Sequence, residues 1–185
     1  MKAILPAIAI ATGSLLGLAS FGAHAADGTI TITGSIADTT CSINGVASGT
    51  QANLPVTLQP VTSGSLSAAG ATAGTSNQAD MQLKLTGCGG TATKAIARFE
   101  NGSTVDPTTG NLINSGTATN VQVRLLNAQM APINIATSAN NVSGVNSATI
   151  AAGAATVGYF AQYYATGKAT AGTVNTTVQY SMQYQ

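Results

Sequence analysis

Few residues of this chain are able to take part in acid–base, nucleophilic or metal chemistry. The 185 residues include one histidine, His24, together with two cysteines and five carboxylates. His24 lies in a segment with the features of a signal peptide, so the processed chain has no imidazole for a Ser-His-Asp or Cys-His arrangement, or for most zinc and copper sites. The carboxylates are scattered, with no sign of a glycosidase pair. We therefore expect no enzymatic activity, no metal site and no cofactor.

The first residues predict export. A charged N-terminus is followed by an apolar run from Ala3 to Phe21 and by the small-residue pattern Ala23-His24-Ala25. This pattern is typical of a signal peptide over residues 1–25, cleaved between Ala25 and Ala26. The apolar run contains proline and glycine and ends at the processing site, which argues against a membrane anchor. We expect no direct insertion into a membrane.

The two cysteines, Cys41 and Cys88, form an even pair in an exported chain. An even count predicts one disulfide, made in an oxidising compartment. A redox or metal pair is disfavoured, because neither a CxxC spacing nor clustered histidine is present. Closing a loop of this length stabilises a fold by about 4 kcal/mol in the chain-entropy model.

Charge restricts the partners that this chain would bind. Without the first 25 residues, five basic and five acidic side chains remain, so the formal charge is zero. Nucleic acids and anionic membranes require a basic surface, so neither is expected as a partner. A surface of Thr, Ser, Asn, Gln, Ala and Gly with so few charges suits a subunit packed against copies of itself.

The elements that must position these residues are β-strands. Apolar and polar residues alternate over residues 28–36, 81–86, 121–125 and 174–184, and further strands are expected at 53–58, 95–99 and 159–163. Turns rich in Gly, Ser and Asn separate them, and no segment after the signal peptide combines helical spacing with capping signals. The pattern predicts one all-β domain, an antiparallel sandwich without internal repeats.

The strand expected first along the processed chain leaves two interpretations open. One face of residues 28–36 is apolar or small, and the other carries Thr and Ser. Such a strand either closes its own sheet or is added to the sheet of a neighbour. The residues of the apolar or small face are Gly28, Ile30, Ile32, Gly34 and Ile36.

Taken in order, four features resemble the chaperone-usher pilins of Gram-negative bacteria, in particular the major structural subunits of type 1 fimbriae. They are the N-terminal strand with Gly34 seven residues before Cys41, then "MQLKLTGC", then "ATNVQVRLLNAQMAPINI", and finally "YFAQYYATGKATAGTVNTTVQYSMQYQ" with its tyrosine next to last. The resemblance covers essentially the whole processed chain. One departure is Ala171-Gly172, where many relatives have Pro-Gly, a change that slightly loosens the turn.

The resemblance implies an immunoglobulin-like sandwich that lacks its last strand and leaves an apolar groove beside the C-terminal strand. A periplasmic chaperone would lend the missing strand, and at the outer-membrane usher the N-terminal extension of the next subunit would replace it. Residues 26–36 are then the donor-strand extension and residues 37–185 the pilin domain. The expected groove edge and chaperone contact consists of Val178, Tyr180, Met182, Tyr184 and Gln185.

The implied function is that of a structural subunit of a fimbria on the bacterial surface, polymerised head to tail and supporting cell adhesion. Implied partners are neighbouring copies, the chaperone, the usher, and tip adhesin or adaptor subunits. The alternatives are a minor or adaptor subunit and a self-contained secreted immunoglobulin-like binding domain. Copy number in isolated fibres separates a major from a minor subunit.

Overall fold

The computed structural model describes residues 30–33, 40–142 and 144–185. The chain divides into two compact units, Met1–Ser35 and Ile36–Gln185. In the first unit, residues 30–33 have no regular secondary structure, and Ile30 and Ile32 are each 90 % exposed. The strand expected over residues 28–36 otherwise lies outside the described residues, as do Ala25 and Ala26.

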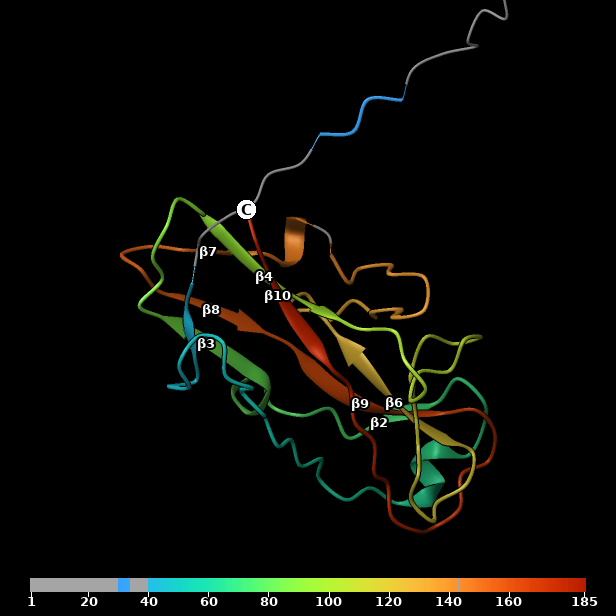
Figure 1. Cartoon of the computed structure of the whole chain (residues 1–185). Coiled ribbons are helices and arrows are strands. Elements are labelled where there is room, and N and C mark those ends of the chain that lie inside the picture. Colours follow the sequence, from blue (N-terminus) through green and yellow to red (C-terminus); the bar gives the residue numbers. More distant parts are fainter. Residues whose placement is uncertain (1–29, 34–39, 143) are drawn as a thin grey trace, which may run out of the picture. The chain divides into compact units, whose positions relative to one another are not determined.

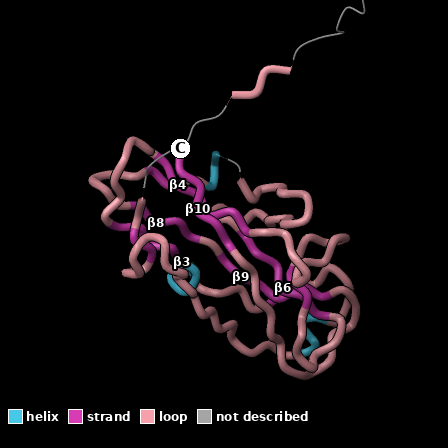
Figure 2. The backbone as a smooth tube through the Cα atoms, viewed as in Figure 1, coloured by secondary structure: helices cyan, strands magenta, loops and turns pink. Residues whose placement is uncertain are grey.

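The second unit is built almost entirely of short antiparallel strands and the loops between them (Figures 1 and 2). Among the described residues there is no α-helix, and no helix is long and apolar enough to cross a membrane. The part of the chain that the structure describes contains three turns of 3-10 helix, η1 (Ser63–Leu66), η2 (Gln78–Met81) and η3 (Gly144–Asn146). The strands are β1 (Ser42–Ile43), β2 (Thr72–Ala73), β3 (Gln82–Thr86), β4 (Lys94–Phe99), β5 (Leu112–Ile113), β6 (Val121–Leu126), β7 (Ala148–Thr149), β8 (Ala155–Gly158), β9 (Phe160–Ala165) and β10 (Tyr180–Tyr184).

The described residues form three sheets, with strand orders β1-β3-β8, β2-β9-β6-β5 and β10-β4-β7. Only Tyr159 separates β8 from β9, so the first two sheets are linked through nearly continuous chain. Buried side chains from β4 pack in one cluster with those of β3, β6 and β8. The expectation of an all-β antiparallel fold is therefore confirmed.

Alternating burial explains the central strands. In β3, Leu83 and Leu85 are buried while Lys84 and Thr86 are exposed, as the two-residue period requires. Strand β3 ends just before Gly87, whose φ is +61°, a left-handed conformation that glycine adopts without strain. This end brings Cys88 to Cys41, and the predicted disulfide is present.

Strand β6 differs from the simple in–out pattern expected for residues 121–125. Gln122 is buried and Arg124 is half-buried, because polar neighbours cover that face. Gln122 donates to Asp106 at 2.7 Å, and Arg124 donates to Gln162 at 2.9 Å. Polar residues of β6 thus lie among hydrogen-bond partners that alternation alone does not reveal.

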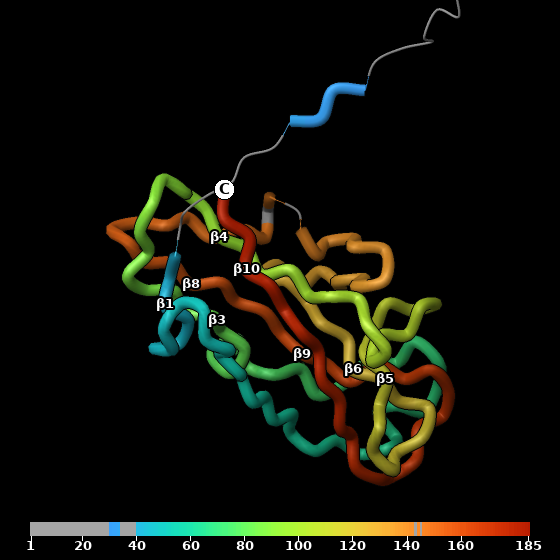
Figure 3. Tube along the Cα trace, viewed as in Figure 1, coloured from blue at the N-terminus to red at the C-terminus, as the bar shows by residue number. Residues whose placement is uncertain are grey.

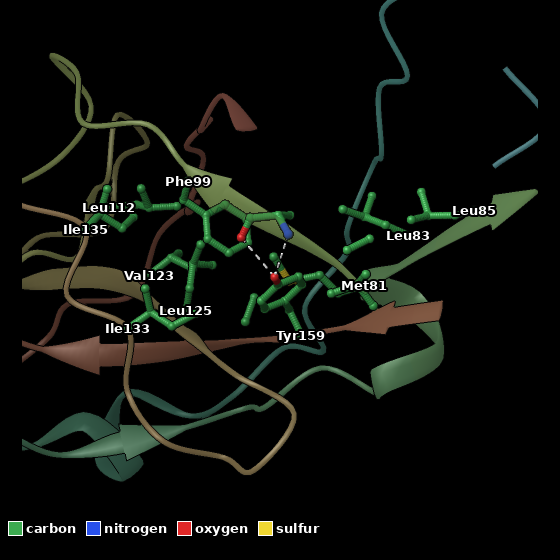
Figure 4. Close-up of a cluster of buried hydrophobic side chains, with 14 of the residues drawn as sticks. Met81, Leu83, Leu85, Phe99, Leu112, Val123, Leu125, Ile133, Ile135 and Tyr159 are labelled. Atoms are coloured by element: carbon green, nitrogen blue, oxygen red, sulfur yellow. Dashed lines mark hydrogen bonds between the residues drawn. The ribbon is translucent and has the colours of Figure 1, made fainter. Parts of the chain in front are cut away.

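One edge of β4 is completed by side chains where β7 no longer pairs with it. The Tyr159 hydroxyl accepts a hydrogen bond from Ala97 N at 3.1 Å and donates to Ala97 O at 2.9 Å (Figure 4). Asn141 does the same at Phe99, accepting from its N at 2.9 Å and donating to its O at 2.7 Å. Both side chains are 1 % exposed, so they satisfy backbone groups that water does not reach.

Two strand predictions are corrected by the structure. Residues 53–58 are extended but have no ladder partner among the described residues, so they are not a strand. The last strand, expected over residues 174–184, begins only at Tyr180. In both segments the burial still alternates, because one side faces the core, whereas a strand also needs a paired backbone.

Candidate functional site

The two unpaired segments enclose a groove of about 1490 Å³. Residues 51–58 form its N-terminal wall and residues 174–182 its C-terminal wall, shown as blue-green and red tubes in Figure 3. A volume above the usual 300–1,000 Å³ of a small-molecule pocket, lined by two extended segments, suits a length of polypeptide better. The floor consists mainly of apolar core side chains, among them Met81, Leu83, Phe99, Leu112, Val123, Leu125, Tyr159 and Ala161.

The C-terminal wall presents unpaired backbone to this groove. Gln185 exchanges hydrogen bonds with Lys94, and Glu100 N donates to Gln179 O at 2.9 Å, so the odd-numbered residues of β10 bond to β4. In an antiparallel ladder the intervening residues turn their N–H and C=O groups to the opposite edge. The backbone of the even-numbered residues therefore faces the groove, and β10 is the edge strand of its sheet.

The two walls run in opposite directions. Ala52 lies near Tyr180, because the Tyr180 hydroxyl donates to its carbonyl at 2.7 Å. Beyond the end of the N-terminal wall, Leu66 lies in a second apolar cluster, and Val174, at the start of the C-terminal wall, packs against this cluster. The N-terminal wall therefore runs from the Tyr180 end of the C-terminal wall toward its Val174 end. A strand placed between the walls would be parallel to one and antiparallel to the other, and both would have free backbone groups to offer it.

The start of the C-terminal wall is held by a neighbouring loop. Ser115 N donates to Asn175 O at 2.8 Å, and Ala118 N donates to Thr173 O at 3.0 Å. The turn before this wall needs Gly172, because a Cβ there would lie 2.4 Å from the backbone N of Ala118. The C-terminal wall is thus fixed by this loop at one end and by β4 at the other.

The groove carries little charge. Glu100 is the one charged residue in the described lining, and it accepts a hydrogen bond from Ser181 and lies 3.8 Å from Arg98. Burial raises the pKa of Tyr180, and burial followed by the proximity of Tyr180 raises the pKa of Tyr184. Both hydroxyls therefore stay protonated and able to donate near neutral pH. Nothing in the described lining would favour a charged ligand.

The residues expected at the groove edge lie along one wall, apart from the last. Val178, Tyr180, Met182 and Tyr184 line the groove. Gln185 does not line it, and its carbonyl instead accepts hydrogen bonds from Thr93 N at 2.7 Å and Lys94 N at 2.9 Å. Of the expected donor-strand residues, only Ile30 and Ile32 fall within the described chain.

The opposite wall was not recognised from the sequence. Residues 53–58 carry a strand pattern, but the pattern says nothing of a missing partner strand. The link from Tyr180 to Ala52 was also missed, because it joins residues 128 positions apart. The alternation of Ala52, Leu54, Val56 and Leu58 was the available signal that this segment has a buried side.

Comparisons with known proteins agree with this architecture. The family model described as "Fimbrial protein" matches residues 30–185. The chain is 37 % identical to the major fimbrial subunit SMF-1 of Stenotrophomonas maltophilia (strain K279a), covering 92 % of this chain and 99 % of that protein. It is also 37 % identical to the F17 fimbrial protein of Escherichia coli, covering 94 % and 96 %.

Solved pilus structures share the fold at lower identity. A chaperone-usher pilus subunit matches with a TM-score of 0.56 and 18 % identity, over 86 % of this chain and 96 % of that one. The P pilus rod subunit PapA matches with a TM-score of 0.52 and 16 % identity, over 78 % and 99 %. The immunoglobulin-like pilin fold implied by the sequence is therefore confirmed. By its family match and its curated relatives, the chain belongs to the fimbrial protein family.

Proposed function

We propose that this chain is the major subunit of a chaperone-usher fimbria and that copies join by insertion of residues 28–36 of one subunit into the groove of the next. As a member of the fimbrial protein family it is a structural protein of the bacterial surface and not an enzyme. The observation that carries the joining mechanism is the groove itself: among the described residues its N-terminal wall has no ladder partner, and its C-terminal wall is paired along one edge only. A sandwich in this state lacks one strand.

Residues 28–36 have the composition that this groove would accept. They carry no charge, and the lining has one charged residue among those described. Ile30 and Ile32 are each 90 % exposed, and burying each isoleucine would contribute about 2 kcal/mol. Backbone hydrogen bonds to both walls would add a ladder of the strand-addition type.

Insertion into the next copy explains a fibre. The donor segment and the groove are different surfaces, so the contact is heterologous and does not close on itself. Repeating it gives an open filament. The curated relative from Stenotrophomonas maltophilia is named a major fimbrial subunit, which supports a major rather than a minor or adaptor role.

Before assembly, the same groove requires cover, since an exposed apolar groove of this size favours aggregation. We propose that a periplasmic chaperone occupies it along Val178, Tyr180, Met182 and Tyr184, contacts Gln185, and yields to the next subunit at the outer-membrane usher. Export would depend on a signal peptide over residues 1–25, cleaved between Ala25 and Ala26. The domain that folds would then be residues 37–185.

Charge placed on either face of the donor segment tests this proposal. Ile32→Asp would put a carboxylate into the apolar groove and is expected to abolish surface fibres, because an unpaired buried charge is strongly unfavourable. Thr31→Asp, on the opposite face, is the matched control and is expected to leave fibres in place. Fibres would be counted by electron microscopy of cells that produce only one variant. Normal fibres from the Ile32→Asp variant would refute strand insertion by this segment.

A further inference from the structure

Tyr180 joins the two walls of the groove. Its hydroxyl donates to the carbonyl O of Ala52 at 2.7 Å, and both residues line the groove. Within the described part of the chain, this is the one hydrogen bond between the N-terminal wall and the C-terminal wall. Apart from this bond, the described residues of the N-terminal wall and the C-terminal wall are linked only through apolar packing on the core.

The N-terminal wall is the weakly held side of the groove. From residue 51 to residue 61 the described chain forms no other hydrogen bond, and what remains is apolar packing of Leu54, Val56 and Leu58 against the core. The C-terminal wall, by contrast, is bonded to β4 and to the loop that contains Ser115. The position of the N-terminal wall thus depends on Tyr180 more than on any other polar contact.

We propose that Tyr180 is a positioning residue that holds the N-terminal wall in place and thereby lengthens the time for which an inserted strand stays bound. This inference rests on the proposed function, since it assumes that the groove receives a strand. A wall that is already in place bonds to the strand without first being ordered, and this preorganisation strengthens binding. A loosened wall would offer fewer lasting hydrogen bonds, so the strand would leave sooner.

Tyr180→Phe isolates the hydroxyl from the ring. The ring of Tyr180 packs against the main core, and phenylalanine keeps that contact while removing the bond to Ala52. Tyr164→Phe is the control. Tyr164 lies on β9 and is not among the described groove-lining residues, and its hydroxyl has no hydrogen-bond partner among the described residues.

The first arm of the test measures the wall without any inserted peptide. Chymotrypsin can cut the purified monomeric subunit after Leu58, whereas the bond after Leu54 is blocked by Pro55. Cleavage of a native protein reports local opening of the cut segment. Cleavage at Leu58–Gln59 would be followed by mass spectrometry. We expect it to be about tenfold faster in Tyr180→Phe, a ratio typical of one lost hydrogen bond, and unchanged in Tyr164→Phe. Equal rates in wild type and Tyr180→Phe would overturn the inference.

The second arm measures the strand. A synthetic peptide of residues 27–36 is bound to the same purified subunits, and its dissociation is followed. We expect Tyr180→Phe to release the peptide about 5- to 10-fold faster and Tyr164→Phe to stay within about twofold of wild type. Faster cleavage with unchanged peptide release would overturn the inference about Tyr180 and leave the proposed function standing. A wild-type subunit that binds no peptide would contradict the proposed function as well.

Discussion

Strand β4 and strand β10 of the C-terminal wall are neighbours in one sheet. The backbone on the outer edge of β4 has hydrogen-bond partners, whereas the backbone on the outer edge of β10 has none among the described residues. At Ala97 and Phe99, where β7 has ended, the side chains of Tyr159 and Asn141 each donate to and accept from the backbone. Along the C-terminal wall, the backbone of the even-numbered residues faces a groove with no partner among the described residues. One edge is satisfied from within the chain and the other is left open.

This difference separates two kinds of stability. The edge of β4 is buried and complete, so it belongs to the fold of the single subunit. The open edge adjoins a large apolar groove, and the proposed function assigns its completion to a strand of the next subunit. A fibre subunit needs both properties, because it has to fold far enough to be recognised and still require its neighbour.

Removing Asn141 should cause the larger loss at the completed edge. Asn141→Leu leaves the buried N–H and C=O of Phe99 without partners, at about 1–3 kcal/mol for each group. We expect the free energy of unfolding of the purified subunit, measured in urea, to fall by about 2–4 kcal/mol. Asn101→Ala, on the exposed surface, serves as the control and should leave it unchanged. An Asn141→Leu midpoint equal to wild type would show that this edge does not depend on its side-chain partner.

Tyr159 gives a smaller effect with a pH signature. Burial raises its pKa to about 12, against 10.0 for the unperturbed side chain. The folded state thus keeps a proton that the unfolded chain loses near pH 10. The stabilisation that this retained proton adds to the free energy of unfolding is complete below pH 10 and is lost as the pH rises to about 12. This stabilisation amounts to about 2–3 kcal/mol.

Comparison of unfolding curves at several pH values checks this prediction. Wild type should lose stability between pH 10 and 12 more steeply than Tyr159→Phe, which lacks the titrating group. The other tyrosines are present in both proteins and cancel in the difference. Parallel pH dependence of the two proteins would mean that Tyr159 is not held protonated in the folded subunit.

The sequence predicted the parts of the fold that alternation controls. Strands β3 and β4 and the pairing of Cys41 with Cys88 follow from local pattern and cysteine count. The incomplete walls did not follow, because alternation reports which side of a segment is buried and not whether its backbone has a partner. The hydrogen bonds that complete the edge of β4 could not be predicted from the sequence either, because Tyr159 and Asn141 lie 62 and 42 residues along the chain from the groups they bond.

Thermal unfolding of a rearranged chain tests the open edge most directly. Residues 27–36 would be moved behind Gln185 on a flexible linker, and the product compared with the processed chain in its natural order. If the segment fills the groove, burial of its three isoleucines predicts a monomer that melts about 12–24 °C higher, while the natural order polymerises or melts low. A natural-order chain that is a stable monomer, with no gain on rearrangement, would mean that the segment closes its own sheet and would contradict the account.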